Sequence, residues 1–370
     1  MACKRLNGKE IEDGLNHTFI YSGKGIAAMG TAAHPGVHDL VQYLLGRSDG
    51  FSLTEEIRQA ILHRENRALL AHVREEFRAI LAACALHLPK SEGEEKIFEA
   101  FVGNLIALIP YTYPEEGEAF DIPIQSEGTW KMARYCVDRK IALTPKWFSS
   151  PIVAYGLVAQ EGPPILSFIG TTFPAGEGHV ATLLADFTPG LSVGHAPYLF
   201  GRDTISHWLA GKSGVQVYGT SLGGALALHT LRHHSEQLAK VCVFNPAGLY
   251  PWHWWGVSYD TGPKVHIYYQ HQDLVASMGS FPTGNQVSVY RVFNHQPEDF
   301  LRAHARLYTG SHQVMMLRSD AQYENGRFCR RVLTVVHFIA SFILFPLILL
   351  GYLLSVVYRR LVENIGSRLS

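Results

Sequence analysis

One serine in this chain stands where its hydroxyl could serve as a nucleophile. Ser221 is the central residue of Gly-Thr-Ser-Leu-Gly at 219–223, between an apolar run at 215–218 and a helix-forming run at 225–231. This pattern predicts a strand, a sharp turn and a helix, with the serine at the turn. The turn needs small neighbours because its serine adopts a strained backbone conformation. The alternative is a glycine-rich turn with a bystander serine, and the flanking strand and helix argue against it.

A serine hydroxyl needs a base to remove its proton and an acidic residue to hold that base. In the chain order serine, acid, histidine, Asp273 follows the apolar run at 264–269, and His312 lies later within 309–314. We therefore predict Ser221, Asp273 and His312 as the catalytic residues. The alternatives are Asp260 for the acid and, for the base, His304 as second choice, followed by His271 and His295.

Ester chemistry at a serine also needs donors that stabilise the negative oxygen of the tetrahedral intermediate. One donor is normally the backbone N–H after the nucleophile, here that of Leu222, and the second comes from a loop after an early strand. The segment 168–172, Phe-Ile-Gly-Thr-Thr, follows such a strand. We predict Thr171 as the second donor, through its N–H and its hydroxyl.

These pieces together resemble the class 3 (fungal-type) lipases of the α/β-hydrolase superfamily. The resemblance covers about residues 150–315. It is carried by Phe168–Thr171, Ala185-Asp186-Phe187, Ser221–Ala225, Asp273-Leu274-Val275 and His312.

The resemblance implies an α/β-hydrolase fold, the Ser221-Asp273-His312 triad and a lid within 172–186. It also implies that Asp186 helps to fix the oxyanion loop. Two residues depart from the family pattern: Thr220 stands where a histidine usually precedes the serine, and Ile169 stands where an arginine often precedes Gly-Thr. Neither departure removes a catalytic group.

The predicted fold class is α/β, with a mostly parallel sheet, a helical N-terminal region and one C-terminal transmembrane helix. Apolar spacing predicts helices at 35–47, 52–89 and 94–108, followed by a loop at 111–128. From about residue 140, strands alternate with helices, which is typical of a parallel sheet. The expected divisions are a mainly helical region at 1–139, a hydrolase domain at 140–325 and a membrane anchor at 332–358.

The run from Val332 to Tyr358 contains no Asp, Glu, Lys or Arg, and arginine pairs flank it on both sides. As a helix it would be roughly 40 Å long, enough to cross a bilayer. The alternative is a hairpin in one leaflet that turns at Pro346. The chain opens with a polar segment and not with a signal peptide, so the catalytic domain is expected to stay in the cytosol-like compartment where it is made.

The amino-acid composition limits the kinds of partner and cofactor that we expect. Lys plus Arg and Asp plus Glu both number 32, so no bulk charge indicates a nucleic-acid partner. The 5 cysteines show no CxxC pair or His/Cys cluster. We expect reduced thiols, no metal and no cofactor.

An aromatic patch at 250–255 follows the strand at 241–244, on the active-site side of the expected sheet. Trp252, Trp254 and Trp255 are predicted to line an acyl pocket or dip into a membrane interface. The alternative is a core plug over the sheet.

The leading hypothesis is a membrane-anchored serine hydrolase that cleaves carboxylic esters, most readily those of lipids, through an acyl-enzyme. A thioesterase or protein deacylase is the nearest alternative. An inactive hydrolase scaffold tethered to a membrane for protein interactions is the alternative of another class. A channel is disfavoured because one apolar run offers no polar lining.

Overall fold

The computed structural model describes residues 67–89, 92–126, 128–145, 151–172, 179–270, 273–294, 304, 312–317 and 327–369. The helix expected at 35–47 and the first part of the helix expected at 52–89 lie outside these residues. So do residues 173–178 of the expected lid, together with His271 and His295.

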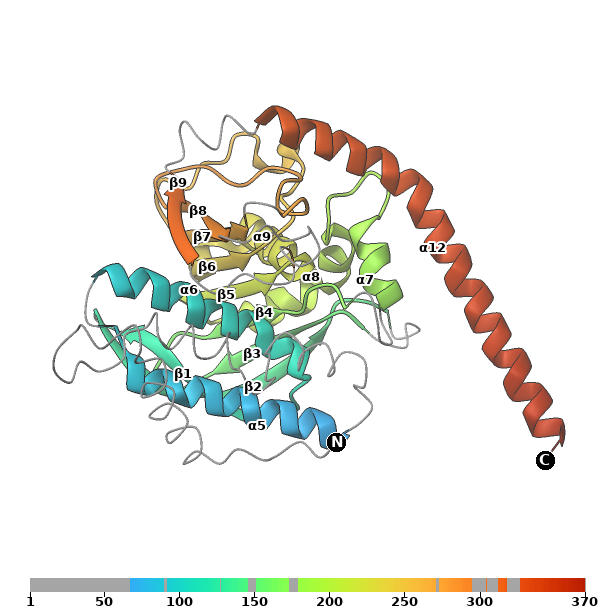
Figure 1. Cartoon of the computed structure of the whole chain (residues 1–370), viewed down its shortest axis with the longest axis horizontal. Helices are drawn as coiled ribbons and strands as arrows, with labels where there is room; N and C mark the ends of the chain where they lie inside the picture. Colours follow the sequence, from blue (N-terminus) through green and yellow to red (C-terminus); the bar gives the residue numbers. More distant parts are fainter. Residues whose placement is uncertain are drawn as a thin grey trace, which may run out of the picture.

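Within the described residues, nine strands form a single sheet and lie side by side in the order in which they occur along the chain (Figure 1). They are β1 (Ala119–Ser126), β2 (Thr129–Ala142), β3 (Val153–Val158), β4 (Ile165–Phe168), β5 (Val215–Thr220), β6 (Leu238–Phe244), β7 (Lys264–Gln270), β8 (Val287–Asn294) and β9 (His312–Leu317). Strands β4 to β8 run parallel to their neighbours in that group. The pairs at both ends of the sheet are antiparallel.

Helices cover the central strands. The described helices are α5 (Arg67–Ala83), α6 (Glu92–Leu108), α7 (His179–Asp186), α8 (His195–Leu209), α9 (Leu222–His234) and α12 (Arg327–Leu369), with short 3-10 turns η1 (Cys84–His87), η2 (Ile109–Thr112), η3 (Ser235–Gln237) and η4 (Pro251–Trp254). In Figure 1, α6 crosses in front of the central strands, while α8 and α9 lie farther back. Strands enclosed in this way lose their polar face, and all four residues of β4 are buried.

The strands expected from the apolar runs are present, but the expected loop at 111–128 is wrong. Most of it is η2 and strand β1. Phe120, Ile122 and Ile124 alternate along β1 and are all buried, which is the period of a half-buried strand. Pro123 is tolerated because β1 is an edge strand, where a missing N–H need not break the sheet.

The region before residue 140 contributes to the same sheet as the rest of the chain. The expected boundary between 139 and 140 falls inside β2, which pairs with β3 from Cys136 to Ala142. Side chains of α5 and α6, such as Phe77 and Phe98, belong to the same buried cluster as the central strands. The sheet therefore begins about twenty residues before the expected boundary at 140.

Helix α12 is continuous through Pro346, so the alternative hairpin is wrong. Among the described residues, this is the one helix long and apolar enough to cross a membrane, over Phe328–Tyr358. Figure 1 shows α12 passing along the body of the molecule and then projecting away from it.

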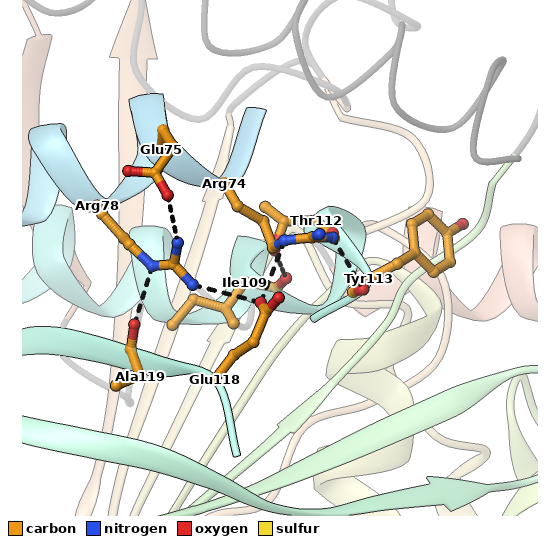
Figure 2. A network of polar contacts seen from close by, with 8 residues as sticks. All are labelled: Arg74, Glu75, Arg78, Ile109, Thr112, Tyr113, Glu118 and Ala119. Carbon is orange, nitrogen blue, oxygen red and sulfur yellow. Dashed lines mark hydrogen bonds and ion pairs between the residues drawn. The ribbon is translucent and has the colours of Figure 1, made fainter. Parts of the chain in front are cut away.

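A polar network ties α5 to η2 and to the start of β1 (Figure 2). Arg74 Nη1 donates to the carbonyls of Thr112 and Tyr113, and its Nε pairs with Glu118 at 3.1 Å. Arg78 Nε donates to the carbonyl of Ala119 at 2.9 Å. Because several of these acceptors are backbone atoms, the network fixes the path of the chain through η2.

We expect Arg74→Met to lower the free energy of unfolding by about 1.5–3 kcal/mol. The substitution removes the guanidinium group, so the partly buried carbonyls of Thr112 and Tyr113 lose a charged hydrogen-bond donor. Lys131→Met is the matched control, since it removes the exposed ion pair with Glu161. That change should cost less than about 1 kcal/mol. Chemical unfolding in detergent micelles measures both, and equal losses would contradict a structural role for the network.

Candidate active site

Ser221 occupies a strained turn between β5 and α9. Its φ and ψ are 55° and −123°, in a region where a residue other than glycine is unusual. Its N–H donates to the carbonyl of Phe244 at 2.9 Å. A Cβ on Gly219 would lie 2.2 Å from the carbonyl oxygen of Gly223, and one on Gly223 would lie 2.4 Å from that of Phe168. The predicted strand, turn and helix are present, and both glycines are sterically required.

Two other side chains join Ser221 in a hydrogen-bonded chain. His304 Nε2 lies 2.7 Å from Ser221 Oγ, and His304 Nδ1 lies 2.9 Å from Asp273 Oδ2. A carboxylate can only accept, so Nδ1 carries the proton and Nε2 has a free lone pair. The serine hydroxyl therefore donates to the histidine. This is the arrangement in which a histidine can remove the serine proton.

The histidine in this chain is the second choice from the sequence, not the first. His312 is the first residue of β9 and is paired with Asn294 at the end of β8. It stands two strands beyond β7, the strand that leads to Asp273. His304 lies in the connection between β8 and β9, and the tertiary structure brings it back over β5. The geometry thus replaces His312 by His304 as the partner of Ser221.

Asp273 lies just beyond β7, at the carboxyl edge of the parallel strands. It is fully buried, and its second oxygen, Oδ1, accepts the N–H of Val275 at 2.8 Å. Both carboxylate oxygens are therefore engaged. The competing residue Asp260 instead accepts hydrogen bonds from Ser258 and from the N–H of Asn285, on an exposed turn.

Asn245 is a site residue that the sequence reasoning missed. It follows β6 directly, with a φ of 44°. Its Oδ1 accepts the N–H of Gln270 at 2.9 Å, and its Nδ2 donates to the carbonyl of His304 at 2.9 Å. It therefore links the end of β7 to the histidine. The sequence feature that could have indicated Asn245 is an asparagine directly after a predicted strand, because asparagine tolerates a left-handed backbone conformation.

The predicted oxyanion donors belong to the residue after the serine and to the loop after β4. Leu222 is the first residue of α9, so its N–H has no acceptor within the helix. Thr171 follows β4, and its hydroxyl donates to Asp186 Oδ2 at 2.9 Å. The Thr171 hydroxyl is thus used in holding its own loop, which leaves the backbone N–H as the group available for a substrate oxygen.

Tyr111 brings the N-terminal region into the site, where the sequence indicated no chemistry. It belongs to η2 and is buried, and its hydroxyl oxygen lies against Gly170. A Cβ on Gly170 would lie 2.3 Å from this oxygen and 2.4 Å from the carbonyl oxygen of Thr220. Tyr111 therefore packs against the loop that carries Thr171.

The ionisable groups influence one another. Burial alone would lower the pKa of His304, but the charge of Asp273 and its hydrogen bond outweigh burial and raise that pKa above 6.5. Burial raises the pKa of Asp186 to about 7, against the opposing effects of the Thr171 hydrogen bond and the nearby His304. Asp186 is thus a carboxyl group that ionises near neutral pH.

The three tryptophans differ in environment. Trp254 is largely buried and its Nε1 donates to the carbonyl of Ser280 at 2.9 Å. Trp252 and Trp255 are 46% and 75% exposed. The Trp252 ring packs on Tyr250, with ring centroids 4.6 Å apart. Trp254 is thus part of the buried core, while Trp252 and Trp255 remain accessible.

Within the described residues, no group of three or more His, Cys, Asp or Glu side chains could hold a metal ion.

No protein-family model matches this chain, and a search of curated proteins finds no match. Among solved structures, the chain is similar to the Lip2 lipase from Yarrowia lipolytica, with 14% identity over 54% of this chain and 78% of that chain and a TM-score of 0.29. A likeness at this level carries no argument about activity, so the function is inferred from the site itself.

We expect Asp186→Asn to stabilise the protein in a pH-dependent way. The folded-state pKa of about 7 lies above the ordinary 3.8, so the acid form fits the fold. Wild-type stability should therefore fall as pH rises from about 4 to about 7 and level off above 7, while an amide stays neutral. At pH 8 the gain should be on the order of 4 kcal/mol, from roughly 1.4 kcal/mol per pKa unit. At pH 4 the two proteins should unfold at similar denaturant concentrations, and parallel pH dependences would contradict the burial of this charge.

Proposed function

We propose that this protein is a serine hydrolase of the α/β-hydrolase fold that cleaves carboxylic esters, most readily those of lipids. The observation that carries the proposal is the chain of hydrogen bonds Ser221–His304–Asp273, at 2.7 and 2.9 Å. The strained serine between β5 and α9 supports it, because this turn presents the hydroxyl at the carboxyl edge of the sheet.

The proposed reaction begins when His304 Nε2 takes the Ser221 hydroxyl proton as Oγ attacks the ester carbonyl carbon. The carbonyl oxygen becomes negative and is held by the N–H groups of Leu222 and Thr171. His304 then gives the proton to the leaving alcohol, and an acyl-serine remains. Water attacks this ester with His304 again as base, which releases the acid and restores Ser221. Asp273 orients the imidazole and stabilises its charged form.

Helix α12 suggests why the substrate would be a lipid. Its length and composition suit a membrane span over Phe328–Tyr358. An anchored site meets an insoluble ester at a high local concentration. The exposed Trp252 and Trp255 are proposed to contact the acyl chain or the membrane interface, where tryptophan is favoured.

The alternatives differ in substrate or in activity. A thioesterase or protein deacylase would use the same three side chains, so only a substrate series separates it from an esterase. An inactive scaffold would have no need for a histidine within hydrogen-bond distance of both Ser221 and Asp273, and the contacts of His304 favour an enzyme over it.

The first test uses the full chain in detergent micelles, a fluorophosphonate probe, and p-nitrophenyl esters and acyl-CoA thioesters of short and long chain. We expect Ser221→Ala to abolish labelling and turnover. His304→Ala should lower kcat by at least about 1,000-fold, because the serine loses its base.

His312→Ala is the matched control and should stay within about threefold of wild type. Loss of activity in His312→Ala with activity kept in His304→Ala would reverse the assignment of the base. A folded wild type that neither labels nor turns over any substrate would leave the inactive scaffold as the better proposal.

The pH profile gives a second test. The base works only when neutral, so kcat/KM should rise with pH through the raised pKa of His304, with a midpoint above 6.5. Asp273→Asn removes the charge that raises this pKa, so the midpoint should move down and kcat should fall by roughly 10,000-fold. A midpoint that does not move in this variant would show that another group controls the acid limb.

A further inference from the structure

Helix α12 has two parts with different surroundings. From Arg330 to Ser341, one stripe of side chains faces the body of the protein, with Arg330, His337 and Ser341 all buried. Their spacing of seven and four residues is that of a single helix face. From Phe342 to Tyr358 most of the large apolar side chains are exposed, as in Leu347, Leu350 and Leu354. The first part is docked on the body of the protein, and the second part is free to enter a membrane.

The docked face is polar. Thr334 Oγ1 accepts the N–H of Gly279 at 2.9 Å. His337 makes two hydrogen bonds, through Nε2 to the carbonyl oxygen of Asp186 at 2.8 Å and through Nδ1 to Tyr250 Oη at 3.1 Å. A carbonyl can only accept, so Nε2 carries the proton. In the neutral ring, Nδ1 then accepts the tyrosine hydroxyl.

Polar side chains are unusual in an apolar run that is otherwise suited to lipid. The run from Val332 to Tyr358 has no Asp, Glu, Lys or Arg, yet it contains His337. A buried imidazole is tolerated only when its nitrogens are hydrogen-bonded, and here both are. A leucine would serve a plain anchor better. The position of this histidine therefore indicates a task beyond anchoring.

The partners of His337 lead to the serine. Asp186 ends α7, its carbonyl oxygen accepts from His337, and its carboxyl group accepts from the Thr171 hydroxyl at 2.9 Å. One residue thus joins the apolar helix to the loop that carries the proposed oxyanion donor. On its other side, His337 is held by Tyr250, which belongs to the loop after β6.

We propose that His337 is a positioning residue for the oxyanion loop, so that docking of the anchoring helix sets the geometry of the active site. This inference rests on the proposed function. Oxyanion donors act over a narrow distance, and a displacement of 1 Å can cost about 100-fold in rate. Removing the bond to Asp186 would let the end of α7, and with it Thr171, relax away from the reacting oxygen.

The test compares three variants of the full chain in detergent micelles. His337→Phe keeps a ring of similar size but loses both hydrogen bonds, and we expect kcat to fall 10- to 100-fold with KM within twofold of wild type. The inhibition constant of a trifluoromethyl ketone, which forms a tetrahedral adduct with the serine, should rise by the same factor. His337→Gln can keep the donor to Asp186 and should recover most of the loss. Thr334→Val removes a docking bond that does not lead to the oxyanion loop, and it should stay within threefold of wild type.

A second readout does not depend on catalysis. Hydrogen exchange of the backbone amides at 179–187 should be faster in His337→Phe than in wild type, and unchanged in Thr334→Val. Three results would each overturn the positioning role. They are exchange at 179–187 in His337→Phe equal to that of wild type and, where the wild type is active, either a kcat of His337→Phe equal to that of wild type or a fall in kcat in Thr334→Val as large as that in His337→Phe. A wild type without labelling or turnover would overturn the proposed function alone, and the exchange data would still decide whether His337 holds α7.

Discussion

The turn at Ser221 is the constraint on which the rest of the site depends. Its φ of 55° is unfavourable for a serine and persists because the surroundings allow no other path. Gly219 and Gly223 approach backbone atoms so closely that no side chain fits at either position. The hydrogen bond from the Ser221 N–H to Phe244 ties the turn to β6. Strain concentrated in this way holds a single hydroxyl above the carboxyl edge of the sheet.

The partners of the serine come from neighbouring points on that edge. Asp273 follows β7, Asn245 follows β6, and His304 reaches back from the connection between β8 and β9. Asn245 connects two of these points, because its side-chain amide accepts the N–H of Gln270 and donates to the carbonyl of His304. The end of β7, which leads to the acid, and the backbone of the base are thereby held by the same side chain.

Both ends of the described chain brace the same loop. From the N-terminal side, η2 is fixed by Arg74 and carries Tyr111, whose hydroxyl group packs against Gly170. From the C-terminal side, α12 reaches Asp186 through His337. The N-terminal region thus contacts the loop after β4 through Tyr111, and the expected anchor reaches it through Asp186, whose carboxyl group accepts from Thr171. A site held from two sides in this way is expected to be more rigid than its loop composition implies.

The sequence by itself determined the elements that depend on near neighbours. The glycines around Ser221 predict the turn, because backbone strain is local, and Asp273 could be placed because it directly follows an apolar strand. The choice of His304 over His312 could not be made locally, since 83 residues separate the histidine from the serine it contacts. Asn245, Tyr111 and His337 likewise have roles only through partners far along the chain. Only the tertiary structure decides such contacts, because a hydrogen bond depends on distance in space, and distance along the sequence does not determine it.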